Sequence, residues 1–153
     1  MSRTVVSADF RAPRGLGNRH VQTLLPRLRS LTPLERDTEI LDLPDGDFVE
    51  LAWARPAPKR HDAPVFVLFH GLEGSFDSPY ARDLLSAATA LGWRAVLMHF
   101  RGCGQALNRL PRAYHSGDTA DAYWLIGQLA KRYPHAIKVA AGVSLGATCW
   151  SSW

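Results

Sequence analysis

Alternating apolar and polar residues mark two short segments near the start of the chain. Residues 38–43 (TEILDL) and 48–54 (FVELAWA) both alternate, and the Pro-Asp-Gly sequence between them is a turn signal. This pattern predicts two strands joined as an antiparallel hairpin. Residues 1–36 are rich in Arg and Pro, which predicts an irregular lead-in with one helical turn within residues 20–25.

Buried strands and amphipathic helices alternate after the hairpin. Continuous apolar runs predict strands that are buried on both faces of a sheet, at residues 64–70, 93–100 and 137–141. Apolar residues at helical spacing predict helices over 79–91 and 118–133, and Gly92 stands where a glycine commonly ends a helix. This order predicts an α/β fold with a parallel sheet and right-handed crossovers. We expect residues 101–117, which carry Gly, Asn and Pro, to form a long surface loop.

Composition and charge narrow the class of protein. The 153 residues are 46% apolar, which suffices for one globular core. The net charge of +4 is spread along the chain, as is typical of a solvated surface, so we expect no nucleic-acid partner. The sequence contains neither a secretory signal nor a run of about 18 apolar residues, so we expect a cytoplasmic protein without an integral membrane segment. Cys103 and Cys149 lack the CxxC spacing of a zinc site, and we expect no metal.

A GxSxG motif marks the end of the last predicted strand, with Gly142, Ser144 and Gly146 at its fixed positions. In a nucleophile elbow the serine occupies a strained turn between strand and helix, and the residues two before and two after it must be small. A helix that begins at Leu145 would offer its N–H groups to developing negative charge. The motif predicts a nucleophilic Ser144, and the alternative is an unreactive strand-to-helix turn.

A second glycine-containing segment, HGLEG, ends the first strand of the predicted parallel sheet. An oxyanion hole takes its second N–H group from the loop after a neighbouring strand. We therefore predict that the N–H groups of Leu72 and Leu145 face each other across the acyl oxygen. We also predict that His70, Gly71 and Gly74 line the substrate site. The alternative is that these glycines only shape a loop.

The chain resembles the YheT-like branch of the α/β-hydrolases, which includes the eukaryotic lipase-like ABHD group. The stretches that carry the resemblance are NRHVQTLLPRL (18–28), HGLEGSFDSPYARDL (70–84), GWRAVLMHFRGCG (92–104), NRLPRAYHSGDTAD (108–121) and GVSLG (142–146). The resemblance implies that residues 37–153 form the N-terminal part of an α/β-hydrolase domain. It also implies a Ser-His-Asp hydrolase that acts on small-molecule or lipid carboxylic esters without a metal or other cofactor. In this family Ser144 would be the nucleophile, with Leu72 and Leu145 as oxyanion donors.

The chain departs from the family pattern after Ser144. In this fold the acid and the histidine of the triad follow the serine in chain order. Residues 145–153 contain no Asp, Glu or His, so we expect a truncated product with little turnover. We expect His70, His99 and His115 to have packing or hydrogen-bonding roles rather than to replace the base.

An incomplete sheet suggests a rival function. The strand before Ser144 would lack its later neighbours, and an uncovered apolar strand edge favours self-association. The rival hypothesis is therefore a non-catalytic remnant of a hydrolase that acts as an interaction module through this edge.

Overall fold

The chain comprises two compact units, which we describe separately. The computed structural model describes residues 11–18, 20–22, 33–111 and 119–148. The units are Met1–Leu31 and Thr32–Trp153. In the first unit, residues 20–22 are helical, where the sequence predicted a helical turn, and the remainder of that predicted turn lies outside the described residues.

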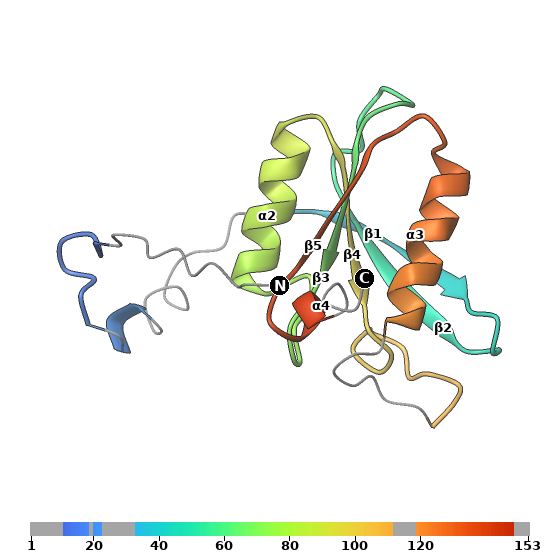
Figure 1. The fold of residues 1–153 in the computed structure, drawn as a ribbon, viewed down its shortest axis with the longest axis horizontal. Helices are drawn as coiled ribbons and strands as arrows, with labels where there is room; N and C mark the ends of the chain where they lie inside the picture. Colours follow the sequence, from blue (N-terminus) through green and yellow to red (C-terminus); the bar gives the residue numbers. More distant parts are fainter. Residues whose placement is uncertain (1–10, 19, 23–32, 112–118, 149–153) are drawn as a thin grey trace, which may run out of the picture. The chain divides into compact units, whose positions relative to one another are not determined.

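A mixed sheet forms the centre of the second unit, and its described part has five strands in the order β1-β2-β4-β3-β5 (Figure 1). The strands are β1 (Arg36–Asp42), β2 (Phe48–Ala54), β3 (Val65–Phe69), β4 (Arg94–His99) and β5 (Lys138–Gly142). Strand β2 pairs antiparallel with β1 and β4, whereas β3 pairs parallel with β4 and β5. The structure therefore confirms the predicted hairpin and the predicted parallel strands.

The hairpin turn follows from its sequence. Gly46 has a φ of 88°, a conformation that glycine adopts without steric cost. Its N–H donates to the carbonyl of Leu43 at 3.0 Å, and the N–H of Leu43 donates to the carbonyl of Asp47 at 2.8 Å. These two bonds close the turn and set the register, in which Asp42 lies opposite Phe48.

Two helices flank the sheet, α2 (Pro79–Ala90) and α3 (Ala120–Arg132) (Figure 1). Helix α2 ends as the sequence predicted, because Gly92 has a φ of 74°. The N–H groups of Gly92 and Trp93 donate to carbonyls of the last turn at 2.9 and 3.0 Å, which is the Schellman arrangement. None of the helices in the described ranges is long and apolar enough to span a membrane.

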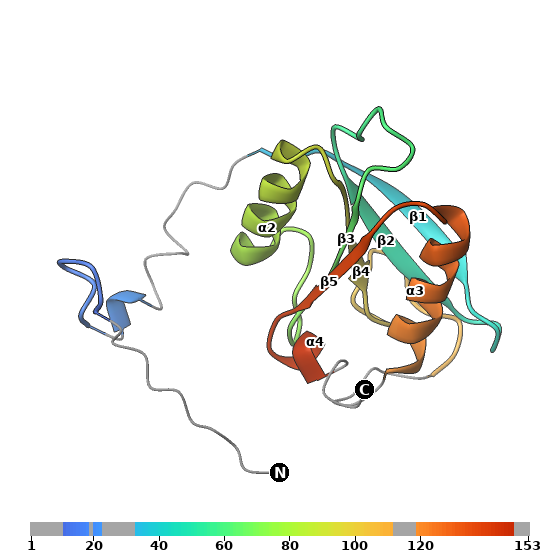
Figure 2. The same cartoon turned by 45° about the horizontal axis from the view of Figure 1, so that its top comes forward.

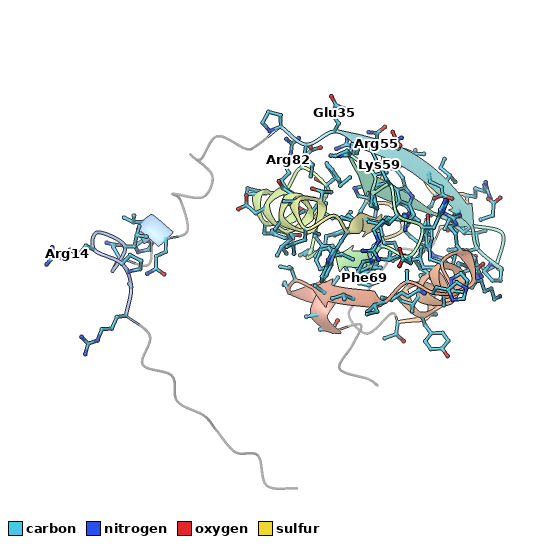
Figure 3. The ribbon with its side chains drawn as sticks, turned by 90° about the horizontal axis from the view of Figure 1, so that it is seen from above. Arg14, Glu35, Arg55, Lys59, Phe69 and Arg82 are labelled. Atoms are coloured by element: carbon cyan, nitrogen blue, oxygen red, sulfur yellow. The ribbon has the colours of Figure 1, made fainter. Side chains whose placement is uncertain are left out.

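The strands bury apolar side chains on both faces of the sheet. Successive residues of a strand point to opposite faces, so a continuous apolar run supplies two cores. On the α3 face, Phe69 belongs to a buried cluster with Leu125, and Figure 3 shows Phe69 in the interior of the unit. On the α2 face, Leu68 belongs to a second cluster with Leu85. All four side chains are fully buried.

The segment after β4 corrects one expectation. We predicted a surface loop from residue 101 onward, but Arg101 is only 3% exposed. Its Nε and Nη2 donate to Asp121 at 2.7 and 2.8 Å. Its Nη1 donates to Asp45 at 2.7 Å and to Asp47 at 3.2 Å. The prediction was wrong at Arg101 because carboxylates from the hairpin turn and from α3 compensate its buried charge. Residues 112–118 lie outside the described part of the loop.

Candidate active site

The short helix α4 (Leu145–Thr148) follows β5 at the end of that strand (Figure 2). Ser144 lies in the turn between the two elements. Its φ of 52° lies in the left-handed region, which non-glycine residues adopt at a cost in free energy. The N–H of Gly146 donates to the carbonyl of Val143 at 3.0 Å, and that of Ala147 donates to the carbonyl of Ser144 at 2.9 Å. Ser144 is exposed, so a strained turn presents its hydroxyl at the end of β5.

The two glycines of the motif are required by close backbone contacts. A Cβ on Gly142 would lie 2.5 Å from the carbonyl carbon of Gly146. A Cβ on Gly146 would lie 2.6 Å from the carbonyl carbon of Phe69 and 2.7 Å from the carbonyl oxygen of His70. All three distances are shorter than real Cβ contacts, and all three involve backbone atoms that cannot rotate away. Glycine at these positions therefore lets β5, α4 and the end of β3 meet.

The segment after β3 forms a tight turn beside Ser144. The N–H of Gly74 donates to the carbonyl of Gly71 at 3.0 Å, and Glu73 has a φ of 52°. Leu72, at the tip of the turn, is 72% exposed. A Cβ on Gly71 would lie 3.3 Å from the Cβ of Ser144, so the fold brings these two distant segments to van der Waals distance.

Two backbone N–H groups at this junction have no hydrogen-bond partner among the residues that the structure describes. Within the described ranges, the N–H of Leu72 and the N–H of Leu145 donate no hydrogen bond. Leu145 follows Ser144 directly, and Leu72 follows the glycine that approaches Ser144. Unpaired, preorganised N–H groups near a hydroxyl can stabilise negative charge that develops on an acyl oxygen.

The His70 side chain contacts the backbone of the Gly71–Gly74 turn from the interior of the unit. The ring is fully buried, and its Nε2 accepts a hydrogen bond from the N–H of Phe100 at 3.1 Å. The proton of the neutral ring is therefore on Nδ1, which donates to the carbonyl of Gly71 at 2.6 Å. Burial lowers the pKa of His70 to about 4, although the bond to Gly71 acts in the opposite direction. His70 is thus neutral at pH 7, and both ring nitrogens are engaged.

His99 is also buried, and like His70 it accepts a hydrogen bond from a backbone N–H. Its Nε2 accepts from the N–H of Phe76 at 3.4 Å, and its Nδ1 lies 3.6 Å from a carboxylate oxygen of Glu50. Burial lowers the pKa of His99, against the raising effect of the Glu50 charge. His115 lies outside the described residues. In the described part of the chain, no histidine is hydrogen-bonded to the Ser144 hydroxyl, and no group of three His, Cys, Asp or Glu side chains could hold a metal ion.

Tyr80 contacts the Gly71–Gly74 turn, but the sequence analysis did not predict a role for this residue. It lies in the first turn of α2, and its hydroxyl accepts a hydrogen bond from the N–H of Gly71 at 3.0 Å. The stretch that resembles the hydrolase family includes Tyr80, yet no local pattern connects the tyrosine with a glycine nine residues earlier. Only the path of the chain from β3 into α2 brings the two groups together.

Comparison with known proteins agrees with this geometry. The sequence profile described as "alpha/beta hydrolase fold" matches residues 64–151, a range that includes β3, β5 and Ser144. The chain belongs to the α/β-hydrolase fold family. Among solved structures, an alpha-beta serine hydrolase homologue from Coxiella burnetii superposes with a TM-score of 0.62 at 19% identity. That match covers 76% of this chain and 56% of the other chain, and it confirms the α/β-hydrolase fold.

Individual relatives place the chain in the YheT-like branch of the family, as the sequence motifs predicted. The candidate esterase YheT of Escherichia coli is 49% identical over 141 residues, which cover 92% of this chain and 42% of YheT. The human phospholipase ABHD3 is 30% identical over 131 residues, which cover 82% of this chain and 32% of ABHD3. This α/β-hydrolase chain therefore spans less than half the length of these two relatives.

Proposed function

We propose that this chain carries the nucleophile and the oxyanion hole of a serine hydrolase that acts on carboxylic esters of small molecules or lipids. The observation that carries the proposal is the left-handed Ser144, with a φ of 52° in a strand-to-helix turn. Strain of this kind persists only where the surrounding structure imposes it, and here Gly142 and Gly146 make the close backbone contacts possible. The names of YheT as a candidate esterase and of ABHD3 as a phospholipase support an ester substrate.

The proposed reaction follows the acyl-enzyme route. Ser144 Oγ attacks the acyl carbon, its proton passes to a base, and the carbonyl oxygen becomes an oxyanion. The N–H groups of Leu72 and Leu145 stabilise that oxyanion, while the backbone of Gly71 and Gly74 lines the site. The leaving alcohol takes up the proton, and water releases the acyl group by the same steps. His70 contributes to the substrate site only through its backbone and through the hydrogen bond from its ring to the Gly71 carbonyl.

The described residues do not supply a base for Ser144. Both ring nitrogens of His70 are engaged, and residues 145–153 contain no Asp, Glu or His. A nucleophile without its base retains a rate about 10³ to 10⁴-fold above water from the oxyanion hole and substrate binding. We therefore propose slow acylation of the 153-residue chain and little turnover.

Labelling with a fluorophosphonate probe tests the proposal, because the serine oxygen displaces fluoride and forms a stable phosphonate ester. We expect slow, stoichiometric labelling of the chain and none in Ser144→Ala. Ser86→Ala, on α2 and away from the turn, is the matched control and should label like the wild type. Equal labelling of the Ser144→Ala variant, or no labelling of wild-type chain that is folded by circular dichroism, would contradict the assignment of Ser144.

One observation favours a second function, that of an interaction module. Strand β5 pairs with β3, and within the described residues no strand pairs with its other edge. The N–H of Val143 and the carbonyl of Ile137 face β3, so the alternation along a parallel strand directs the N–H of Ala140 outward. An unpaired edge of this kind can add a strand from a second copy of the chain.

Sedimentation over a range of concentrations tests this second function. We expect self-association of the wild type that Ala140→Pro weakens, because proline removes the outward N–H and leaves the bonds to β3 intact. A wild-type chain that stays monomeric, or an Ala140→Pro variant with unchanged association, would exclude the β5 edge as the interface.

A further inference from the structure

We propose that Tyr80 is a positioning residue that holds the turn Gly71–Gly74 in the conformation needed for oxyanion binding. Its hydroxyl accepts the hydrogen bond from the N–H of Gly71 at 3.0 Å. In the proposed role, this contact fixes the direction of the Leu72 N–H, which belongs to the next peptide group. The inference rests on the proposed roles of Ser144 and Leu72, and it adds a residue to that machinery.

The need for such a residue follows from the backbone of Gly71. Glycine has the least restricted φ and ψ of any residue, so a glycine directly before a functional N–H does not hold that group by itself. The carbonyl of Gly71 and the N–H of Leu72 belong to one planar peptide group. Any rotation about the backbone of Gly71 therefore turns the Leu72 N–H by the same angle.

Three hydrogen bonds hold the backbone carbonyl and N–H groups of Gly71. Its carbonyl accepts hydrogen bonds from Gly74 N–H at 3.0 Å and from His70 Nδ1 at 2.6 Å. Its N–H donates to the Tyr80 hydroxyl at 3.0 Å, where Gly71 is buried and Tyr80 is half-buried. The bonds to the carbonyl restrain one side of the glycine, and Tyr80 restrains the other. With both sides held, the N–H of Leu72 donates no hydrogen bond to any residue that the structure describes.

Tyr80 is itself held by a rigid support. It belongs to the first turn of α2 and packs against the apolar cluster beneath that helix. The segment that leads into α2 is anchored by the fully buried Phe76 and by Asp77, which accepts hydrogen bonds from Arg36 at 2.9 Å and Arg82 at 2.5 Å. The hydroxyl therefore stays at a fixed place relative to the sheet.

Gly74 leaves the space that the tyrosine hydroxyl occupies. A Cβ on Gly74 would lie 2.5 Å from Tyr80 Oη and 2.9 Å from the Cβ of His70. Any side chain at this position would displace the hydroxyl from the N–H of Gly71. The space required by Tyr80 is thus a structural reason for the second glycine of the HGLEG segment, and Gly74 supplies an independent variant with which to test the contact.

The test compares the wild-type chain with Tyr80→Phe, Gly74→Ala and the control Tyr123→Phe, which removes a hydroxyl from a side chain that is 63% exposed on α3. The rate of fluorophosphonate labelling is measured against probe concentration, which separates the maximal rate from the probe concentration at half-maximal rate. Amide hydrogen exchange at Gly71 and Leu72 is followed in parallel by NMR.

A misdirected oxyanion donor should lower the maximal labelling rate of Tyr80→Phe and Gly74→Ala by roughly 10-fold or more, while the half-saturating concentration stays within about twofold. Gly71 N–H should exchange faster in both variants, and Tyr123→Phe should behave as wild type. A purely structural role for Tyr80 would change stability or probe binding without this selective loss of maximal rate.

The outcomes separate this inference from the proposed function. Ser144-dependent labelling of the wild type at a rate that Tyr80→Phe leaves unchanged would overturn the role of Tyr80 and keep the hydrolase proposal. Loss of probe binding with an unchanged maximal rate would also overturn it. Absence of Ser144-dependent labelling in the wild type would overturn the proposed function and, with it, the positioning role.

Discussion

Replacement of Arg101 by methionine tests the buried ion cluster of the second unit. The Arg101 side chain is 2% exposed and faces three carboxylates, of which Asp47 is 0% and Asp121 10% exposed. Methionine has a similar length but no charge and no hydrogen-bond donors. The substitution therefore leaves two buried carboxylates without their cation and keeps most of the packing.

The expected loss of stability is large for a single substitution. Removal of one partner from a buried ion pair costs about 3–5 kcal/mol in the free energy of unfolding, because the remaining charge is uncompensated. Arg101→Lys keeps the charge but cannot bind Asp121 through two parallel hydrogen bonds, so we expect a smaller loss of about 1.5–3 kcal/mol. Urea unfolding followed by tryptophan fluorescence measures both losses.

The dependence on pH distinguishes an ion cluster from simple packing. In the wild type, the hydrogen bond from Arg101 lowers the pKa of Asp45 below its usual 3.8. A carboxylate with a lowered folded-state pKa stabilises the fold above pH 3.8, and this contribution is lost as the pH falls through the folded-state value. Without Arg101, the pKa values of Asp45 and Asp47 rise, so acid protonates these two carboxylates in the folded state and reduces the cost of their uncompensated charge.

The difference in stability between wild type and Arg101→Met should therefore shrink as the pH falls from 7 toward 4. A difference below about 1 kcal/mol at pH 7, or one that stays constant over this range, would refute the reasoning that buried charge drives the effect. The Arg101→Lys variant serves as the control, since it retains the cation and should follow the wild-type pH profile.

Two further predictions concern the residues around Ser144. Gly146→Ala places a Cβ 2.7 Å from the carbonyl oxygen of His70 and should cost about 1–3 kcal/mol in urea unfolding. Gly127→Ala is its control, because a Cβ there meets no atom within 4 Å; it should stabilise helix α3 by about 0.5–1 kcal/mol, and equal losses in both variants would contradict the steric argument. Burial lowers the pKa of His70 to about 4, so the unfolded chain takes up a proton first on acidification. Stability should then fall between pH 6.5 and 4 by up to about 3 kcal/mol, and urea unfolding should show a flatter profile for His70→Gln, whereas identical profiles would exclude His70 as the cause.

Local patterns in the sequence determined most of the fold and the position of the candidate nucleophile. The hairpin with its Gly46 turn, the end of α2 at Gly92 and the strand-to-helix position of Ser144 all depend on neighbouring residues. Periodicity reports the secondary structure because side chains alternate along a strand and recur every turn of a helix. The motif also predicted that glycine is needed at 142 and 146, which the close backbone contacts explain.

Only the tertiary structure decided which distant groups meet. The loop signal after β4 misplaced Arg101, because the carboxylates that allow its burial come from the hairpin turn and from α3. The hydrogen-bond partners of His70 and the bond between Tyr80 and Gly71 likewise could not be predicted from the sequence, since no local pattern encodes them. Periodicity gives the face on which a residue lies, whereas compensation of a buried charge or donor depends on the order of strands and the path of the connecting loops.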